Sequence, residues 1–127
     1  MNEAIKTTKA PKAVGPYSQA IKAGEYLLTS GQIPIDPETG VFVEGGIKAQ
    51  TKQVMENLRQ VLLAGGLDFT DVVKTTIFIV NMADFGAVNE VYEKYFTNVL
   101  PARSCIGVAS LPKGALVEME VIASRQN

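Results

Sequence analysis

The longest amphipathic stretch of the chain lies between residues 47 and 64. Its apolar side chains recur at spacings of three and four, as on one face of an α-helix. The charged positions on its other faces are Lys48, Lys52, Glu56 and Arg59. Two glycines at 65 and 66 end the pattern. A second helix is expected after Asn81, a candidate N-cap, because an apolar stripe follows at Phe85, Val88, Val91, Tyr92, Tyr95 and Phe96.

Segments rich in β-branched and aromatic residues surround these two helices. They cover residues 17–23, 25–33, 72–80, 103–109 and 116–124. Gly24 separates the first two segments, which predicts a hairpin. The segment 72–80 becomes apolar on both faces toward its end, which is typical of a strand in the interior of a sheet.

The resulting order of elements, β-β-α-β-α-β-β, predicts an α+β fold of two layers. Both helices are expected to cover one face of a mixed β-sheet. Residues 1–127 contain no linker, repeat or low-complexity block, so we expect a single domain. Residues 72–80 and 117–123 offer apolar side chains to both faces of the sheet, and a monomer would leave one face in water. We therefore expect the chain to self-associate into a closed ring.

The charge of the chain is nearly balanced. Twelve Lys and Arg against thirteen Asp and Glu leave a net charge of -1, with no run of one sign. Because a phosphate backbone favours clustered positive charge, nucleic acid is not an expected partner. Charges, glycines or prolines interrupt every apolar run before the roughly 20 residues that span a bilayer, so no membrane insertion is expected. One cysteine and the lack of an apolar leader predict a cytoplasmic protein.

Histidine is absent from the chain, and this narrows the chemistry that it can perform. A zinc site would have to be built almost wholly from carboxylates, although zinc prefers His and Cys. The nucleophile–histidine pairs of hydrolases are ruled out as well. Neither the dinucleotide motif G-x-G-x-x-G nor the triphosphate motif G-x-x-x-x-G-K-[ST] occurs. We expect no metal and no cofactor, so that any acid–base work falls to Asp, Glu, Lys, Tyr or an ordered water.

The segment P-A-R-S-C-I-G-V-A, residues 101–109, contains the first candidate site residues. Strand alternation places Arg103 and Cys105 on the same face. Since the arginine fork binds carboxylates at two points, Arg103 is a candidate anchor for an organic acid. A structural ion pair with Glu118 or Glu120 explains this arginine equally well. Cys105 is either a small core residue or a thiol that Arg103 activates.

Other candidates come from a carboxylate pair and from the first hairpin. Glu118 and Glu120 share one face of the last strand, where one of them can hold or deprotonate a water, or both can face solvent from an edge strand. Tyr17 fits packing in the hairpin or proton donation. The backbone near Ser30 and Gly31 offers donors to an anion, or forms a turn that only needs glycine.

Six motifs in matched order give the chain a resemblance to a known family. They are A-x-G-P-Y-S-Q-A near the start, T-S-G-Q-I-P at 29–34, V-K-T-T-I-F-I at 73–79, V-N-E-V-Y at 88–92, P-A-R-S-C at 101–105 and L-P-K-G-A-L-V-E-M-E-V-I-A at 111–123. Together they span nearly the whole chain. The chain therefore resembles the RidA family, also called the YjgF family.

The resemblance implies an architecture and an activity. Family members resemble chorismate-mutase-type subunits and form homotrimers with a small-molecule site in each cleft between neighbours. Their archetypal activity is the hydrolysis of reactive 2-imino acids, such as 2-iminopropanoate and 2-iminobutanoate, to 2-keto acids and ammonia. The resemblance assigns Arg103 to the substrate carboxylate and Glu118 to the attacking water. Further pocket-lining positions match Tyr17, Ser30, Gly31, Asn89 and Cys105.

The chain departs from the family pattern at one place. Many members read S-C-V-E-V-A-R-L-P where this chain has Gly107 and Ser110 instead of a charged pair. The change spares Arg103 and Glu118 but alters the rim of the site, on which substrate preference depends. Two other functions stay open. One is a non-catalytic trimer that binds small carboxylates or a regulatory partner; the other is a ribonuclease or translation inhibitor, against which the acidic pI near 5.4 and the missing histidines argue.

Overall fold

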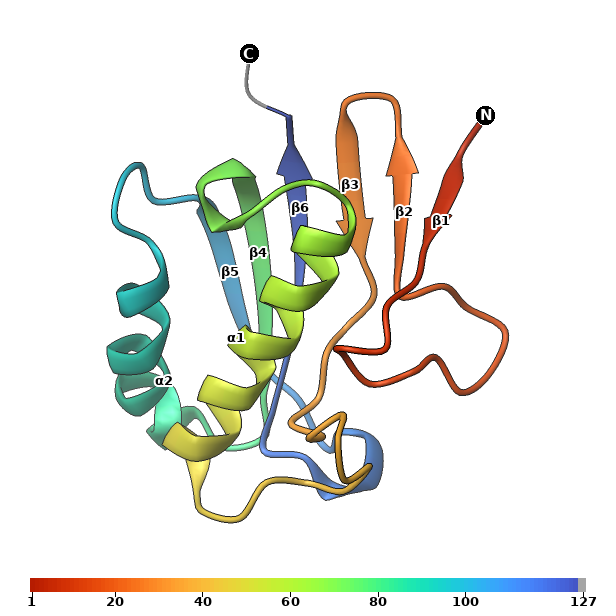
Figure 1. Ribbon diagram of the computed structural model, residues 1–127. Coiled ribbons are helices and arrows are strands. Elements are labelled where there is room, and N and C mark those ends of the chain that lie inside the picture. The colour runs from red at the N-terminus through yellow and green to blue at the C-terminus, as the bar shows by residue number, and fades with distance from the viewer. Residues whose placement is uncertain (126–127) are drawn as a thin grey trace.

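A six-stranded sheet and two α-helices form the protein, whose computed structural model describes residues 1–125 (Figure 1). The helices are α1 (Ile47–Ala64) and α2 (Phe85–Tyr92). The strands are β1 (Glu3–Ile5), β2 (Ala20–Ala23), β3 (Tyr26–Thr29), β4 (Val72–Ile79), β5 (Ala102–Gly107) and β6 (Val117–Ser124). Single 3₁₀ turns lie at 69–71, 82–84, 93–95 and 112–114. The predicted α+β class is confirmed.

The strands lie in the order β1-β2-β3-β6-β4-β5. β4 and β5 are parallel and the other neighbours are antiparallel, so the sheet is mixed as predicted. β4 lies between β6 and β5, which confirms its assignment as an interior strand. β6 lies between β3 and β4, so the alternative in which its glutamates project from an edge strand is wrong.

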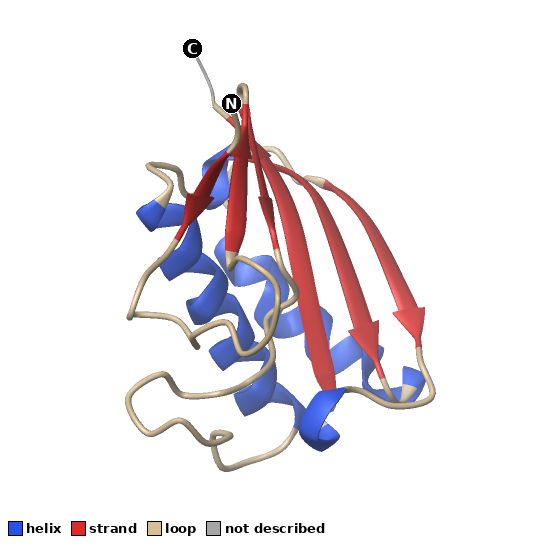
Figure 2. Ribbon diagram, turned by 90° about the vertical axis from the view of Figure 1, so that its right-hand side faces the viewer, coloured by secondary structure: helices blue, strands red, loops and turns tan. Residues whose placement is uncertain are grey.

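Both helices cover the same face of the sheet, and the opposite face carries neither (Figure 2). Alternate residues of β6, Val117, Met119 and Val121, are buried between the sheet and the helices. The apolar stripe of α1 packs there as well, with Val54, Leu58, Val61 and Leu62 fully buried. This confirms the two layers. Within residues 1–125, no helix is long and apolar enough to cross a membrane.

Three local expectations differ from the structure. β1 was not predicted, because three residues are too few to show a pattern and its strand conformation depends on pairing with β2. The hairpin strands are shorter than 17–23 and 25–33, because the buried Gln19 side chain donates to the Thr7 and Pro11 carbonyls and turns the chain aside. The second helix begins with a 3₁₀ turn, which Asn81 caps by accepting from the Ala83 amide.

The helix-free face of the sheet exposes apolar side chains to water. Tyr26 and Leu28 of β3 and Ile106 of β5 are 51%, 42% and 45% exposed. Such a surface is typical of proteins that associate through it. The closed ring inferred from the sequence stays a prediction. The helix-free face of the single chain provides an exposed apolar surface through which such a ring could form.

Candidate functional site

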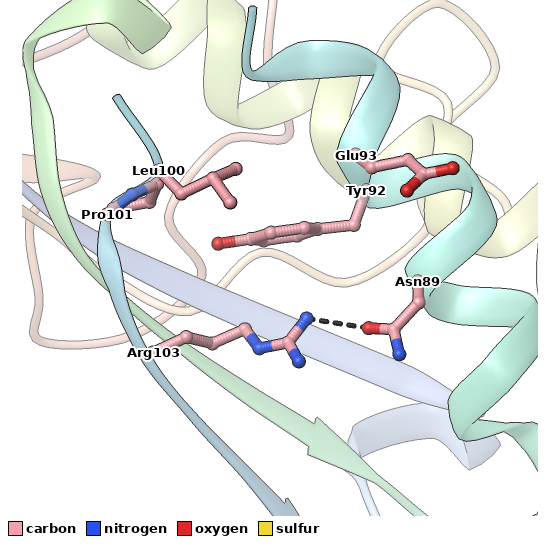
Figure 3. Close-up of a pocket in the computed structure, with 6 residues that line it drawn as sticks. All are labelled: Asn89, Tyr92, Glu93, Leu100, Pro101 and Arg103. Carbon is pink, nitrogen blue, oxygen red and sulfur yellow. Dashed lines mark hydrogen bonds between the residues drawn. The ribbon is translucent and has the colours of Figure 1, made fainter. Parts of the chain in front are cut away.

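Arg103 points from β5 toward α2, on the helix side of the sheet (Figure 3). Its Nη1 donates a hydrogen bond of 2.6 Å to Asn89 Oδ1. The guanidinium carbon lies 5.3 Å from the ring centre of Phe85 and 5.1 Å from that of Tyr92, so two aromatic rings of α2 contact the cation. These contacts fix the guanidinium at an exposed position and leave most of its N–H donors available.

A cavity of about 380 Å³ adjoins this guanidinium. Its lining residues are Asn89, Tyr92, Glu93, Leu100, Pro101 and Arg103 (Figure 3). The Tyr92 ring is nearly buried, and its hydroxyl lies 2.8 Å from Thr75 Oγ1 of β4. Burial raises the pKa of the Tyr92 hydroxyl, which stays protonated at neutral pH. The ring therefore serves as a fixed wall of the cavity.

The structural ion pair considered for Arg103 is wrong. The ion pairs found among residues 1–125 do not include Arg103. The physical reason is the sheet register: Arg103 is level with Thr75, which faces the helices, whereas Glu118 is level with Phe78, which faces the other way. The guanidinium is thus positioned but has no carboxylate partner within residues 1–125.

Glu118 lies on the helix-free face of β6, where its carboxylate packs against Gly31. A Cβ placed on Gly31 would overlap the Glu118 carboxylate, so glycine gives this side chain its space. The Ser30 hydroxyl donates a hydrogen bond of 2.6 Å to the Ser18 carbonyl, which links the segment after β3 to the segment before β2. The Ser30 amide donates to the Gln19 carbonyl, so this amide is not free for an anion.

Burial raises the pKa of Glu118, and the neighbouring carboxylate of Glu120 raises it further. Glu120 itself is exposed and solvates its charge in water. A carboxylate with a raised pKa holds a proton more readily than an ordinary glutamate. Glu118 is therefore better suited to accept a proton from water than an exposed glutamate would be.

The chain thus carries two half-sites on opposite faces of one sheet. The Arg103 half-site comprises Arg103, Asn89, Cys105 and the aromatic rings of Phe85 and Tyr92. The Glu118 half-site comprises Glu118, Gly31, Ser30 and Tyr17. The structure brings Arg103 against Asn89, Phe85 and Tyr92 and brings Glu118 against Gly31, but it does not join the two half-sites within one chain. The membership of Cys105, Ser30 and Tyr17 in these half-sites stays a prediction. No group of three or more His, Cys, Asp or Glu residues in the described chain is arranged to hold a metal ion.

Comparison with known proteins identifies the family. The model of the family described as Endoribonuclease L-PSP matches residues 7–125. The 2-iminobutanoate/2-iminopropanoate deaminase of Mus musculus is 49% identical over 123 residues, which are 97% of this chain and 91% of that protein. The chain belongs to the RidA family. Its sequence motifs and its fold lead to the same assignment.

Solved RidA-family structures have the same fold. A crystal structure from Thermotoga maritima is 50% identical, covers all of both chains and superposes with a TM-score of 0.97. E. coli TdcF, whose crystal structure contains bound serine, is 40% identical, covers 98% of this chain and 99% of its own, and has a TM-score of 0.94. The fold described above is therefore that of the RidA family over the whole described chain.

Cys105, a predicted pocket position, lies two residues beyond Arg103 on the same face of β5. The thiol is half-buried and packs against the hydrophobic core. Burial raises the pKa of the Cys105 thiol, and the opposing effect of the Arg103 charge is smaller. This raised pKa disfavours an activated thiolate in the single chain, and contact between Cys105 and a ligand stays a prediction.

For Tyr17, the interpretation as a residue packed in the hairpin is wrong. Its side chain is 52% exposed, so it is not part of the packing of the hairpin. Its hydroxyl accepts a hydrogen bond of 3.4 Å from the Val14 amide. Contact between Tyr17 and a ligand stays a prediction.

The two aromatic rings that hold Arg103 were not predicted as site residues from the sequence. Phe85 and Tyr92 were assigned to the apolar stripe of the second helix, together with core residues. The signal that could have revealed them is their spacing around Asn89, since positions 85, 89 and 92 share one face of a helix. That face meets the arginine of β5.

Gly31 provides a first test of the Glu118 half-site. We expect Gly31→Ala to reduce activity on 2-imino acids by about tenfold or more, because the new Cβ displaces the Glu118 carboxylate. The melting temperature should change little, since the displaced group is the end of a flexible side chain. Gly46→Ala serves as the matched control, because Gly46 has open space around it and, like Gly31, no left-handed φ. Full activity in Gly31→Ala would show that the position of Glu118 is unimportant.

Proposed function

We propose that the protein hydrolyses reactive 2-imino acids to 2-keto acids and ammonia, as a homotrimer with its sites between neighbouring chains. The observation that carries the proposal is Arg103, which is held by Asn89 and two aromatic rings yet has no carboxylate partner in the described chain. A fixed, unpaired guanidinium is suited to bind the carboxylate of a substrate. Deaminase-named relatives of 47–49% identity support the same reaction.

The second part of the proposal is a composite site. Arg103 and Glu118 lie on opposite faces of their own sheet and cannot act on one small molecule from there. If the helix-free face of one chain meets the β5 edge of the next, the Glu118 half-site of one copy joins the Arg103 half-site of its neighbour. The exposed apolar residues of that face support such an association.

The proposed reaction needs only positioning and one proton acceptor. Arg103 binds the carboxylate of the 2-imino acid and fixes its imine carbon. A water held by Glu118 adds its oxygen to that carbon while the carboxylate takes a water proton. That proton is returned to the nitrogen, which completes a carbinolamine. Glu118 then carries the proton of the new hydroxyl to the nitrogen, the C–N bond breaks as the C=O bond forms, and ammonia and the 2-keto acid leave. The chain's own carboxylate and guanidinium suffice for these steps, so we propose a reaction without a cofactor.

The activity is tested by trapping an imine before it hydrolyses unaided. A dehydratase that releases 2-iminobutanoate is run with semicarbazide, which competes for the imine, and semicarbazone formation is followed by absorbance. We expect the protein to suppress the semicarbazone signal and to speed the release of 2-ketobutyrate. If neither rate changes at micromolar concentrations of the protein, it is not a deaminase of this substrate.

The pH dependence of this activity follows from Glu118. A carboxylate that accepts a proton must be ionised, and burial raises the pKa of Glu118 above its ordinary value. We therefore expect kcat to fall as the pH decreases, with a midpoint above 4.5, the ordinary value for glutamate. The profile is measured on imines released at several pH values, after subtraction of the unaided hydrolysis. A flat profile down to pH 4 would contradict the role of Glu118.

Two other functions give different results in simple experiments. A non-catalytic binding trimer would give saturable heats with 2-ketobutyrate in calorimetry but no suppression of the semicarbazone. A ribonuclease, the activity in the family model's description, would cleave RNA after stringent purification, and Arg103→Ala would leave that cleavage unchanged if a separate site were responsible. Neither has a residue cluster in the described chain that favours it over imine hydrolysis.

A further inference from the structure

A second cavity, of about 490 Å³, lies between α1 and α2, which run side by side on the helix layer (Figure 1). We propose that this groove binds a small phosphorylated anion with the charge of a diphosphate. Its polar lining consists of Lys48, Lys52, Glu56, Arg59, Lys94 and the ring of Tyr95. Three observations support this proposal: the positive charge of the groove, the fixed position of Arg59 and the separation of the groove from the Arg103 and Glu118 half-sites.

The groove concentrates positive charge on an otherwise acidic chain. Four cations and one carboxylate line it, whereas the whole chain has a net charge of -1. The cluster is not apparent as a run of charge in the sequence, because Lys48, Lys52 and Arg59 are spaced along α1 and Lys94 comes from the turn after α2. Phosphoryl groups are the anions that such clusters of Lys and Arg bind.

The arginine of the groove is held in place before any ligand binds. The guanidinium carbon of Arg59 lies 5.1 Å from the ring centre of Tyr95 and 5.5 Å from that of Phe69. Glu56 Oε2 accepts a hydrogen bond of 2.6 Å from the Tyr95 hydroxyl and contacts Arg59 Nη1 at 3.4 Å. The groove therefore has a fixed guanidinium, and Glu56 is the group within it that opposes an anion.

Two of the three lysines of the groove, Lys52 and Lys94, are available to a ligand. Lys48 forms an ion pair with Glu90. Lys52 and Lys94 are exposed and do not occur in the ion pairs found among residues 1–125. Two unpaired ammonium groups that line the same groove as one fixed guanidinium match an anion with two phosphoryl groups better than a single carboxylate.

The groove is separate from the Arg103 half-site. Asn89 and Tyr92 of α2 line the Arg103 cavity, whereas Val91 of the same helix lines the groove. One helix thus separates the two cavities, and a ligand in the groove leaves Arg103 unoccupied. The proposal is independent of imine hydrolysis and stands or fails without it.

The test is calorimetric titration with pyrophosphate at low ionic strength. We expect saturable binding by the wild-type chain and a dissociation constant raised by about tenfold or more in the double variant Lys52→Gln/Lys94→Gln. Glu56→Gln removes the opposing charge but keeps an acceptor for Tyr95, so it should bind pyrophosphate more tightly. Arg103→Ala should bind it as the wild type does. Thermal melts establish that each variant is folded.

Several results would overturn the proposal. Heats that do not saturate at millimolar pyrophosphate, or equal affinity in the double lysine variant, would mean that the groove is not a site. Weaker or unchanged binding in Glu56→Gln would contradict the charge argument. Loss of binding in Arg103→Ala would place the anion at the Arg103 half-site. Tighter binding of a short single-stranded RNA than of pyrophosphate would replace the small molecule with a nucleic acid.

Discussion

Replacing Arg103 by alanine is expected to lower kcat/KM for 2-iminobutanoate by about 10²- to 10³-fold. The variant loses the two-point contact with the substrate carboxylate, which is present in the ground state and in the transition state alike. Most of the loss should therefore appear in KM. Arg103→Lys keeps the charge but not the planar fork, so we expect it to restore only part of the activity.

The fold should survive this substitution, because the Arg103 side chain is exposed and the side chains that hold it are Asn89 and two aromatic rings of α2. Arg125→Ala is the matched control, since Arg125 is another exposed arginine, at the far end of β6. It should retain wild-type kinetics. An Arg103→Ala protein with unchanged KM would remove the carboxylate anchor from the mechanism.

Glu118→Gln is expected to lower kcat by about 10²- to 10⁴-fold while leaving KM nearly unchanged. The amide fills the same space beside Gly31 but cannot accept the proton of the attacking water. The variant should also melt at a higher temperature than the wild type near neutral pH. Because the raised pKa of Glu118 means that its ionised form is disfavoured in the folded state, ionisation lowers the stability of the wild type as the pH rises.

The gain in stability has a definite pH window. It should be largest above the raised pKa of Glu118 and should vanish below pH 4, where the carboxyl is protonated in both the folded and the unfolded state. Glu120→Gln is the matched control on the same face of β6. It should retain activity and move the acidic limb of the pH profile to lower pH, since Glu120 helps raise the pKa of Glu118. Equal loss of kcat in both variants would contradict a specific role for Glu118.

Periodicity predicted the elements that have enough residues to show a pattern. The helix expected at 47–64 is α1, because a long apolar stripe defines its length and the glycines at 65 and 66 define its end. β1 escaped prediction, since three residues show no period. The hairpin strands were predicted too long because a buried side chain, Gln19, competes with the ladder for backbone groups. Such competition depends on contacts that are distant in sequence.

Part of the candidate site, too, could be predicted from the sequence and part could not. Motifs singled out Arg103 and Glu118, and alternation placed Arg103 and Cys105 on one face. Alternation alone does not relate one strand to another, however. Only the pairing of Thr75 with Arg103 and of Phe78 with Glu118 shows that the two functional side chains leave opposite faces of the sheet. The motifs therefore predicted the groups, and the structure adds that one chain keeps them apart.

The composite site is tested most directly by mixing two inactive variants. Arg103→Ala and Glu118→Gln chains are unfolded together, refolded at equal concentrations and assayed with 2-iminobutanoate. In a randomly mixed trimer, an intact site forms wherever a chain with Arg103 meets a neighbour with Glu118, so about a quarter of the wild-type activity should return. If the refolded mixture is no more active than the separate variants, Arg103 and Glu118 do not act across two chains.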